Sequence, residues 1–354
     1  MQRTRNPRVS VVVPTRNEAR NLEVVLPAIA AVRPRVHEII VVDGHSTDGT
    51  LETAKRVLPW VRTMTQTRKG KGNALACAFA AVTGDIIVMF DADGSADPNE
   101  IPRFVAALLA GADFAKGSRF IEGGGSEDIT LLRKTGNAGL NGVANALFGT
   151  QYTDLCYGYN AFWTDILPIL DLPPVDAPPP PDGGMLWGDG FEIETLLNCR
   201  VAAAGLRITE VPSVERERIY GQSNLRTFAD GTRVLRTLAA ERRRAARLGL
   251  LGRKRPTMLP APPAALPSGA HGAAVAPVPQ QPTPPPQPQV PAPPPAPAQP
   301  PAPAAASASA PPPATRPSPR PRIDLSGRPF PTPPVRRDMP EGIGLRYALD
   351  EEPA

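Results

Sequence analysis

The chain has 354 residues, 47 of them proline, and a formal net charge of +5 at pH 7. That modest charge favours anionic partners, but it does not choose between a nucleotide, a lipid phosphate and a nucleic acid. No stretch reaches the roughly 18 apolar residues of a membrane span, and no apolar signal segment precedes the first predicted strand, so neither kind of segment is expected.

Proline content divides the chain into two parts. Roughly two-thirds of the prolines lie after about residue 255, among alanine, glutamine and serine. Such a segment buries too little apolar surface to offset the entropy lost on ordering it. We therefore predict a folded domain over residues 5–250 and a disordered proline-rich tail over residues 255–354.

The three cysteines, Cys77, Cys156 and Cys199, have neither the spacing of metal ligands nor that of a disulfide framework. This use of cysteine is typical of proteins in a reducing compartment. We therefore expect a cytoplasmic protein.

Strands and helices alternate through about the first 120 residues. β-Branched and apolar runs predict strands at residues 9–13, 39–42, 61–65, 85–90 and 114–116. Helical spacing of apolar residues predicts helices at residues 17–31, 51–58 and 71–82, and a fourth that begins at Asp97. This alternation predicts βαβ units, a mostly parallel sheet flanked by helices, and therefore the α/β class.

Polar residues follow three of these strands. They are residues 14–18 after the first strand, Asp43 after the second, and Asp91 and Asp93 after the fourth. In a parallel sheet the carboxyl ends of the strands share one edge, where ligands bind. Three polar strand ends on one edge therefore predict a binding site.

The triplet Asp91-Ala92-Asp93 is the strongest chemical signal in the chain. Two carboxylates two residues apart, where a buried strand ends, can hold one hard divalent cation such as Mg²⁺ or Mn²⁺. A metal held this way can neutralise a departing diphosphate. Taken alone, such a triplet is more often an ordinary turn.

The turn after the first strand excludes two other classes of nucleotide-binding protein. A dinucleotide dehydrogenase would show Gly-x-Gly-x-x-Gly, whereas the chain has Pro14-Thr15-Arg16-Asn17. A sugar-nucleotide pyrophosphorylase would show a Gly-rich, Arg-containing loop at the same place. The P-loop pattern is also absent from the sequence.

Five segments resemble, in order, the family 2 glycosyltransferases of GT-A fold, which transfer a sugar from a nucleoside diphosphate with inversion. They are residues 11–18, 41–50, 69–74, 91–93 and 117–120. This resemblance covers residues 8–121, the nucleotide-sugar half, and implies a Rossmann-like GT-A domain.

Further segments resemble the polyprenyl- and dolichyl-phosphate sugar synthases and carry the resemblance into the acceptor half, residues 122–250. They are residues 154–162, 190–194, 210–212 and 218–224. The chain departs from the family pattern at Asn224, where lysine is frequent, and near Ser95, where an amide-bearing residue is frequent. Residues 173–184 look like an insertion.

The resemblance implies a donor site with bound Mg²⁺ or Mn²⁺. Asp43 would contact the nucleoside, and Lys71 would face the diphosphate. Asp91 would contact the ribose or, through water, the metal, while Asp93 would bind the metal directly. The other residues expected to line the nucleotide cleft are Pro14, Thr15, Asn17 and Glu18. The alternatives are a first-turn helix charge for Glu18 and a simple turn for Lys71.

The resemblance also implies a set of phosphate and acceptor contacts, and it makes Asp93 and Arg218 catalytic. The set is Arg119, Arg133, Arg218 and Ser223. Guanidinium forks fit phosphate oxygens and remain charged. For each arginine, a solvated surface position is the alternative.

The expected reaction is transfer of a hexose from a nucleotide-diphosphate sugar to a polyprenyl phosphate, with UDP-glucose and GDP-mannose both open as donors. A lipid phosphate is already anionic and attacks without a strong base. A saccharide or other hydroxyl acceptor is the alternative and would need a base, for which Asp189 is the best-placed candidate. Glu192 and Glu194 are expected to support the helix that follows them.

Residues 225–251 mix arginines with leucine and alanine, and Arg253-Lys254-Arg255 follow. A basic amphipathic helix can rest on an anionic membrane, so we expect peripheral contact at the cytoplasmic membrane face through residues 233–255. A solvated helix that packs its leucines on the core is the alternative. No nucleic-acid partner is expected. A catalytically dead scaffold with a proline-rich tail is a further alternative, and the intact Asp91 and Asp93 argue against it.

Overall fold

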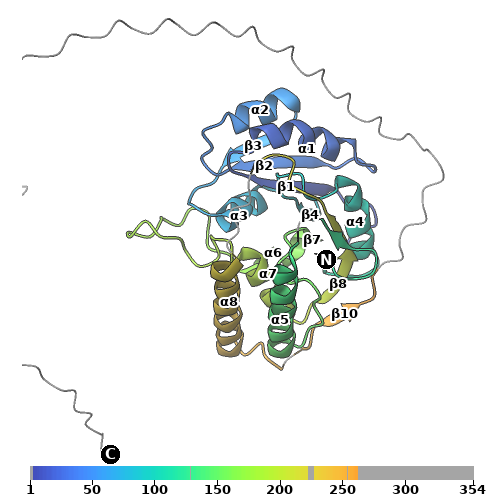
Figure 1. Ribbon diagram of the computed structural model, residues 1–354, viewed down its shortest axis with the longest axis vertical. Coiled ribbons are helices and arrows are strands. Elements are labelled where there is room, and N and C mark those ends of the chain that lie inside the picture. Colours follow the sequence, from blue (N-terminus) through green and yellow to red (C-terminus); the bar gives the residue numbers. More distant parts are fainter. Residues whose placement is uncertain (1–2, 128, 222–226, 253, 262–354) are drawn as a thin grey trace, which may run out of the picture. The chain divides into compact units, whose positions relative to one another are not determined.

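Figure 1 shows the computed structural model of the chain, which describes residues 3–127, 129–221, 227–252 and 254–261. These residues lie within one unit, Met1–Ala274, and the second unit, Val275–Ala354, falls outside the described residues. The predicted tail over residues 255–354 therefore lies outside the described residues from position 262 onward.

Eight strands form the central sheet in the order β10-β8-β5-β7-β4-β1-β2-β3. In chain order they are β1 (Val9–Thr15), β2 (Glu38–Asp43), β3 (Arg62–Thr65), β4 (Ile86–Met89), β5 (Phe114–Ser118), β7 (Asn160–Trp163), β8 (Arg207–Pro212) and β10 (Thr257–Leu259). Neighbouring strands are parallel, except that β7 runs antiparallel to both β4 and β5. The mostly parallel sheet is thus confirmed. Strand β10 corrects the predicted domain end at residue 250, because the sheet continues to Leu259.

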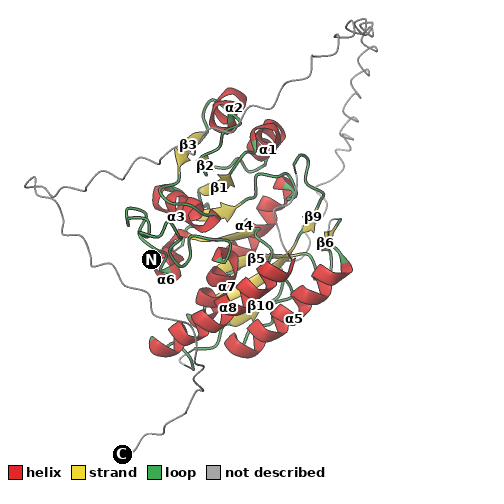
Figure 2. Cartoon of the chain, turned by 60° about the vertical axis from the view of Figure 1, so that its left-hand side comes forward, coloured by secondary structure: helices red, strands yellow, loops and turns green. Residues whose placement is uncertain are grey.

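Helices cover both faces of this sheet (Figure 2). In chain order they are α1 (Ala19–Ala31), α2 (Thr50–Val57), α3 (Lys71–Ala81), α4 (Ile101–Leu109), α5 (Leu131–Phe148), α6 (Leu167–Leu170), α7 (Ile193–Ala203) and α8 (Thr227–Arg247). Short 3₁₀ turns at Pro98–Glu100 and Thr164–Ile166 precede α4 and α6. A separate two-stranded sheet pairs β6 (Gly125–Ser126) with β9 (Val214–Glu215).

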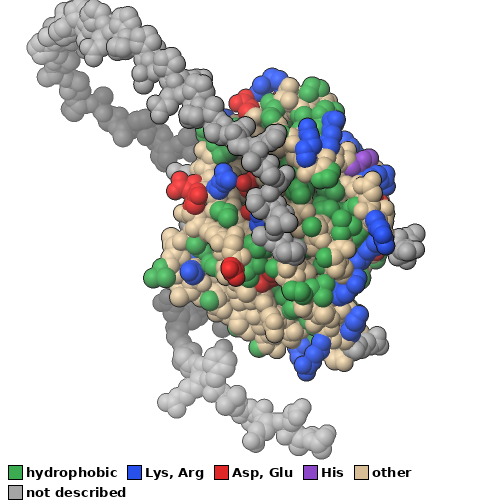
Figure 3. Space-filling view, turned by 90° about the vertical axis from the view of Figure 1, so that its right-hand side faces the viewer, with side chains coloured by type: hydrophobic (Ala, Val, Ile, Leu, Met, Phe, Trp, Pro, Cys, Tyr) green, Lys and Arg blue, Asp and Glu red, His purple; other side chains and the backbone are tan. Residues whose placement is uncertain are grey.

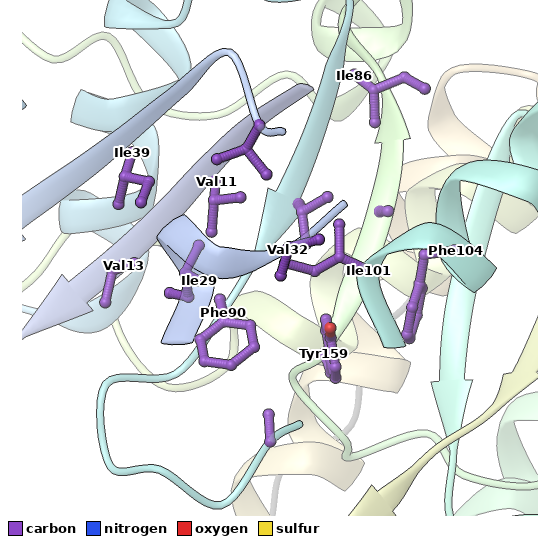
Figure 4. Packing of buried hydrophobic residues seen from close by; sticks show 14 of the residues in the cluster. Val11, Val13, Ile29, Val32, Ile39, Ile86, Phe90, Ile101, Phe104 and Tyr159 are labelled. Atoms are coloured by element: carbon purple, nitrogen blue, oxygen red, sulfur yellow. The ribbon is translucent and has the colours of Figure 1, made fainter. Parts of the chain in front are cut away.

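The central strands are buried on both faces, which explains their continuous apolar runs. Successive side chains of a strand point to opposite faces. Val11 and Val13 therefore pack with residues of α1, α2 and α4 in a cluster that includes Phe90 and Tyr159 (Figure 4). Val12 packs into a second cluster, with residues of α3, α5, α7 and α8.

Two helix starts show how local chemistry sets the boundaries. Helix α1 begins two residues later than the predicted start at residue 17, because Asn17 has a left-handed φ of 57° and Glu18 is the cap residue. Asp97 caps as predicted, since its side chain accepts a hydrogen bond from the Asn99 backbone N–H at 2.9 Å. It caps the 3₁₀ turn from which α4 continues.

Figure 3 shows cationic side chains on one face of the described domain. On the face shown in Figure 3, Lys and Arg side chains occur from the top to the bottom, with few Asp and Glu side chains between them. Within the described residues, no helix combines the length and the apolar composition of a membrane span.

Candidate active site

The carboxylates of Asp91 and Asp93 lie at the end of β4, where the sheet edge is polar. Ala92, between them, is buried, whereas both aspartates are partly exposed. Asp91 Oδ1 lies 2.7 Å from Lys71 Nζ, and Asp93 Oδ2 lies 2.9 Å from Arg218 Nη2. Each carboxylate therefore faces a cation supplied by a distant part of the chain.

Arg218 joins the start of α1 to the Asp93 turn. Its Nη1 lies 3.0 Å from Glu18 Oε1, so one guanidinium bridges two carboxylates. Burial raises the pKa of the Glu18 carboxyl above its usual value. The Ile219 backbone N–H donates to the Asp93 carbonyl at 3.1 Å. The structure thus brings together Glu18, Asp93 and Arg218, three residues predicted for the site.

Gly94 lets this segment approach the turn closely. Its φ is 80°, and a Cβ built there would lie 2.4 Å from Ile219 Cδ1. A side chain at Gly94 would therefore be strained and would also displace the Arg218 segment.

Asp43 is buried at the end of β2 and has one unused oxygen. Its Oδ2 accepts the Ser46 N–H at 3.0 Å, while Oδ1 has no hydrogen-bond partner among the described residues. A buried acceptor without a partner is costly, and such atoms occur where a ligand supplies the donor. The position fits the predicted nucleoside contact.

The first turn is fastened to the second by hydrogen bonds. The Asn17 N–H donates to Ser46 Oγ at 2.8 Å, and its Oδ1 accepts the Thr47 N–H at 2.9 Å. The Thr15 hydroxyl donates to the Val42 carbonyl at 3.2 Å, and Pro14 is half-buried. Side chains predicted to line the nucleotide cleft therefore also join the turn after β1 to the turn after β2.

The ammonium of Lys71, predicted to face a diphosphate, forms two ion pairs within the protein. Its Nζ lies 2.7 Å from both Asp91 Oδ1 and Glu194 Oε1. Burial alone would lower the pKa of Lys71, but the Asp91 and Glu194 carboxylates outweigh it and raise that pKa. The ammonium is therefore held between two carboxylates. Sequence reasoning missed the role of Glu194, because a glutamate in the first turn of a helix does not reveal a partner on α3.

The N-terminus of α3 is covered by the backbone of Gly188 and Asp189. A Cβ at Gly70 would lie 2.0 Å from the Asp189 carbonyl oxygen, and one at Gly72 would lie 1.9 Å from that of Gly188. The Asn73 N–H donates to the Asp189 carbonyl at 3.1 Å. Gly70 and Gly72 therefore allow the start of α3 to contact the backbone of residues 188–189. The Asn73 N–H already has a hydrogen-bond partner there.

Asp189, the predicted base for a hydroxyl acceptor, is fully buried and paired with Arg68. Arg68 Nε lies 2.7 Å from its Oδ2, and Arg68 Nη2 lies 2.9 Å from its Oδ1. Arg68 Nη1 also donates to the carbonyls of Pro174 and Ala177, at 2.8 and 2.9 Å. Both oxygens of Asp189 thus accept hydrogen bonds from Arg68. The same guanidinium holds residues 174–177, part of the predicted insertion, through their carbonyl groups.

Arg119, the predicted phosphate contact, is likewise paired within the protein. Its Nε and Nη2 lie 2.7 and 2.9 Å from the two oxygens of Asp154, and its Nη1 lies 2.8 Å from Glu215. The guanidinium also lies 4.8 Å from the centre of the Tyr157 ring. The guanidinium is thus paired with one buried carboxylate, Asp154, and one partly exposed carboxylate, Glu215.

The other two predicted acceptor residues are not placed at the Asp91–Asp93 turn by any described contact. Arg133 lies in the first turn of α5, and its backbone N–H donates to the capping hydroxyl of Thr130 at 3.3 Å. Ser223 lies outside the described residues.

Three asparagines on α5 hold residues 152–155 through hydrogen bonds. Asn145 Nδ2 donates to the Tyr152 carbonyl at 2.9 Å, and Asn141 Oδ1 accepts the Leu155 N–H at 2.8 Å. Asn137 Nδ2 donates to Asp154 at 3.2 Å. Their four-residue spacing places all three on one helix face. That spacing is visible in the sequence, and it was missed.

The fold and the site define an α/β enzyme with acidic residues at the carboxyl edge of its sheet. The glucosyl-3-phosphoglycerate synthase of Mycobacterium tuberculosis shares this fold. Its UDP complex has a TM-score of 0.51 at 23% identity, over 67% of this chain and 80% of that one. Its complex with Mn²⁺, UDP-glucose and phosphoglyceric acid has a TM-score of 0.50 at 23% identity, over the same shares of the two chains.

Sequence similarity identifies the family. Residues 10–167 match the model of glycosyl transferase family 2. The chain is 33% identical to a polyprenol monophosphomannose synthase of Mycolicibacterium smegmatis, over 62% of this chain and 81% of that protein. It is 32% identical to an undecaprenyl-phosphate mannosyltransferase of Micrococcus luteus, over 62% of this chain and 87% of that protein. The chain therefore belongs to the family 2 glycosyltransferases.

Proposed function

We propose that this glycosyltransferase moves a hexose from a nucleoside-diphosphate sugar to a polyprenyl phosphate, with inversion at the anomeric carbon. The observation that carries the proposal is the assembly of Asp43, Asp91, Asp93 and Arg218 at one sheet edge. The names of the two bacterial relatives, both polyprenyl-phosphate mannosyltransferases, support the acceptor and favour mannose as the hexose.

The donor's nucleoside is proposed to bind at Asp43. The unused Oδ1 of Asp43 is an acceptor only, so it selects an N–H or O–H group of the base or ribose. The fastened turns that carry Pro14, Thr15 and Asn17 form the adjoining wall. This wall is built before the ligand arrives, which lowers the ordering cost of binding.

A divalent cation, Mg²⁺ or Mn²⁺, is proposed to bind at Asp91 and Asp93. Both groups are carboxylates, which Mg²⁺ and Mn²⁺ accept as ligands, and Asp91 Oδ2 lies outside the Lys71 ion pair. Asp93 Oδ1 accepts the Ser95 N–H and hydroxyl, and its Oδ2 pairs with Arg218, so a cation would replace Arg218 at Oδ2. Within the described residues no group of three or more His, Cys, Asp or Glu side chains could hold a metal, so phosphate and water oxygens would complete the shell. When bound, the cation neutralises charge on the departing diphosphate.

The pairing of Asp189, the predicted base, with Arg68 favours a phosphate acceptor over a hydroxyl acceptor. An oxygen of the lipid phosphate attacks the anomeric carbon, the new C–O bond forms, and the bond to the nucleoside diphosphate breaks. No proton has to be removed, whereas a hydroxyl would need a base. Asp189, the candidate for that base, is held by Arg68. Arg218 is proposed to contact phosphate oxygens when it leaves Asp93.

A polyprenyl phosphate resides in a membrane, so we propose that α8 rests on its surface. Arg236, Arg243 and Arg247 are exposed on this helix, whereas Leu238 and Ala245 are buried against the core. Cationic side chains near a membrane are attracted to anionic lipids. Binding to lipid vesicles measures this contact directly.

The function is tested by transfer of label from UDP-glucose or GDP-mannose into polyprenyl phosphate, with Mg²⁺ or Mn²⁺ present. We expect label in the organic phase, and a loss of about 100-fold or more in the Asp93→Asn protein. Asp85→Asn is the matched control, because Asp85 lies just before β4, at the opposite end of that strand, and pairs with Arg8. A protein that binds the donor but labels no lipid would contradict the proposal.

A further inference from the structure

Glu194 lies inside the site but has no part in the proposed transfer. It belongs to the first turn of α7, and only 10% of its side chain is exposed. Its Oε1 lies 2.7 Å from Lys71 Nζ, whose other partner is Asp91 Oδ1, also at 2.7 Å. The Lys71 ammonium of α3 thus lies between two carboxylates, that of Glu194 on α7 and that of Asp91 after β4.

Gly158 lies close to all three charged groups of this cluster. A Cβ built on it would lie 3.1 Å from Asp91 Oδ2, 3.4 Å from Lys71 Nζ and 3.5 Å from Glu194 Oε1. The backbone of residue 158 therefore packs directly on all three charged groups. The ammonium has little room to move, and its position fixes the orientation of the Asp91 carboxylate.

The charges of the cluster favour a further cation. Two carboxylates share one ammonium, so the cluster carries a net charge of −1 when all three groups are ionised. Without Glu194, the ammonium would be paired with Asp91 alone and would cancel the charge that Asp91 offers to a metal. Opposite charges at such short range interact strongly in a site that is partly closed to water.

We propose that Glu194 is a positioning residue that acts through Lys71: it holds the ammonium so that Asp91 stays oriented and negative enough to bind the divalent cation. This inference rests on the proposed metal–nucleotide site. Residues one shell away from a metal commonly tune its affinity by orienting its ligands.

The test is the affinity of Mn²⁺ for the purified protein, measured by electron paramagnetic resonance with UDP and, separately, with GDP present. We expect Glu194→Gln to weaken Mn²⁺ binding by about 10-fold. Glu192→Gln is the matched control: both glutamates are buried to the same extent, but Glu192 accepts the N–H groups of Gly188 and Gly190 instead of contacting Lys71. The control should bind Mn²⁺ as the unaltered protein does.

A double-mutant cycle separates action through Lys71 from a general structural effect. In the Lys71→Met protein, Glu194→Gln should no longer weaken Mn²⁺ binding, because the ammonium that Glu194 holds is gone. Thermal unfolding confirms that each variant is folded. If Lys71→Met does not fold, Glu194→Asp replaces it: its shortened carboxylate should weaken Mn²⁺ binding while keeping the charge.

Two results would overturn the inference. One is unchanged Mn²⁺ affinity in Glu194→Gln, and the other is an equal loss with and without Lys71. Failure of the proposed function has a different signature: the unaltered protein would then bind Mn²⁺ no better with UDP or GDP than without them.

Discussion

At the scale of single residues, the site separates arginines that are free to exchange partners from those that are not. Arg68 is 2% exposed and sits on the fully buried Asp189, and Arg119 sits on the fully buried Asp154. Arg218 is 27% exposed and bridges two carboxylates that are themselves partly exposed. An exposed ion pair is worth little and can open, whereas a buried one cannot lose one partner cheaply.

Asp189 gives the sharpest residue-scale prediction. Replacing it with alanine leaves the Arg68 guanidinium buried without its carboxylate, so we expect the free energy of unfolding to fall by about 3–5 kcal/mol. Urea denaturation measures this change. Asp182→Ala, at an exposed position of the same loop, should change stability by no more than about 0.5 kcal/mol. An Asp189→Ala protein of normal stability that has lost transfer would instead restore Asp189 as a base.

The residue types of the site could be predicted from the sequence, but their partners could not. Asp43, Asp91 and Asp93 follow strands, and strand ends can be read from apolar runs, so their common edge was predictable. Arg119 and Asp189 also lie in sequence motifs. Their side chains nevertheless pair with Asp154 and Arg68, which lie 35 and 121 residues away in sequence. Such long-range pairing leaves no local signal.

At the scale of elements, α8 has one side that packs on the core and another that is exposed to solvent. Leu238 is fully buried, as the core-packing alternative requires, but Leu235 is 47% exposed, and Leu248, directly after the helix, is 51% exposed. Arg236, Arg243 and Arg247 recur at intervals of seven and four residues, which places them on one face. An exposed face with arginine and leucine suits the surface of an anionic membrane.

This face predicts binding to vesicles that contain anionic lipid. Replacing Arg236, Arg243 and Arg247 with glutamine should weaken binding by about 100-fold, at about 1 kcal/mol per cation. Cosedimentation with vesicles measures the change. The control replaces three exposed cations outside α8, Arg5, Arg33 and Lys55, with glutamine and should retain most of the binding. Equal binding by both triple variants would show that α8 is only a solvated helix.

Element boundaries were predictable to within a few residues, and the exceptions have physical causes. Helix α1 is delayed by the left-handed Asn17, whose side chain is needed to fasten the neighbouring turn. Strand β10 has three residues and follows a charged stretch, so its sequence carries little of a strand's apolar pattern. It forms because β8 offers a free edge.

At the scale of the whole molecule, the site is assembled by sheet order. Glu18, Asp43, Asp93, Glu194 and Arg218 span 201 residues of sequence, counted inclusively, yet gather at one end of the sheet. Strand β7 makes this possible, because it enters antiparallel between β4 and β5. The alternation of strands and helices predicts a parallel sheet, but it cannot reveal this insertion, which depends on contacts between distant segments.

The proposed acceptor is a polyprenyl phosphate, whose phosphate oxygen attacks without the help of a base. The most direct measurement is a competition between polyprenyl phosphate and the polyprenol of equal chain length, with labelled donor and Mg²⁺ or Mn²⁺. We predict that label enters the phosphate and that the alcohol receives almost none. Transfer to the alcohol at a comparable rate would contradict this account, because it would require a base that the described site does not provide.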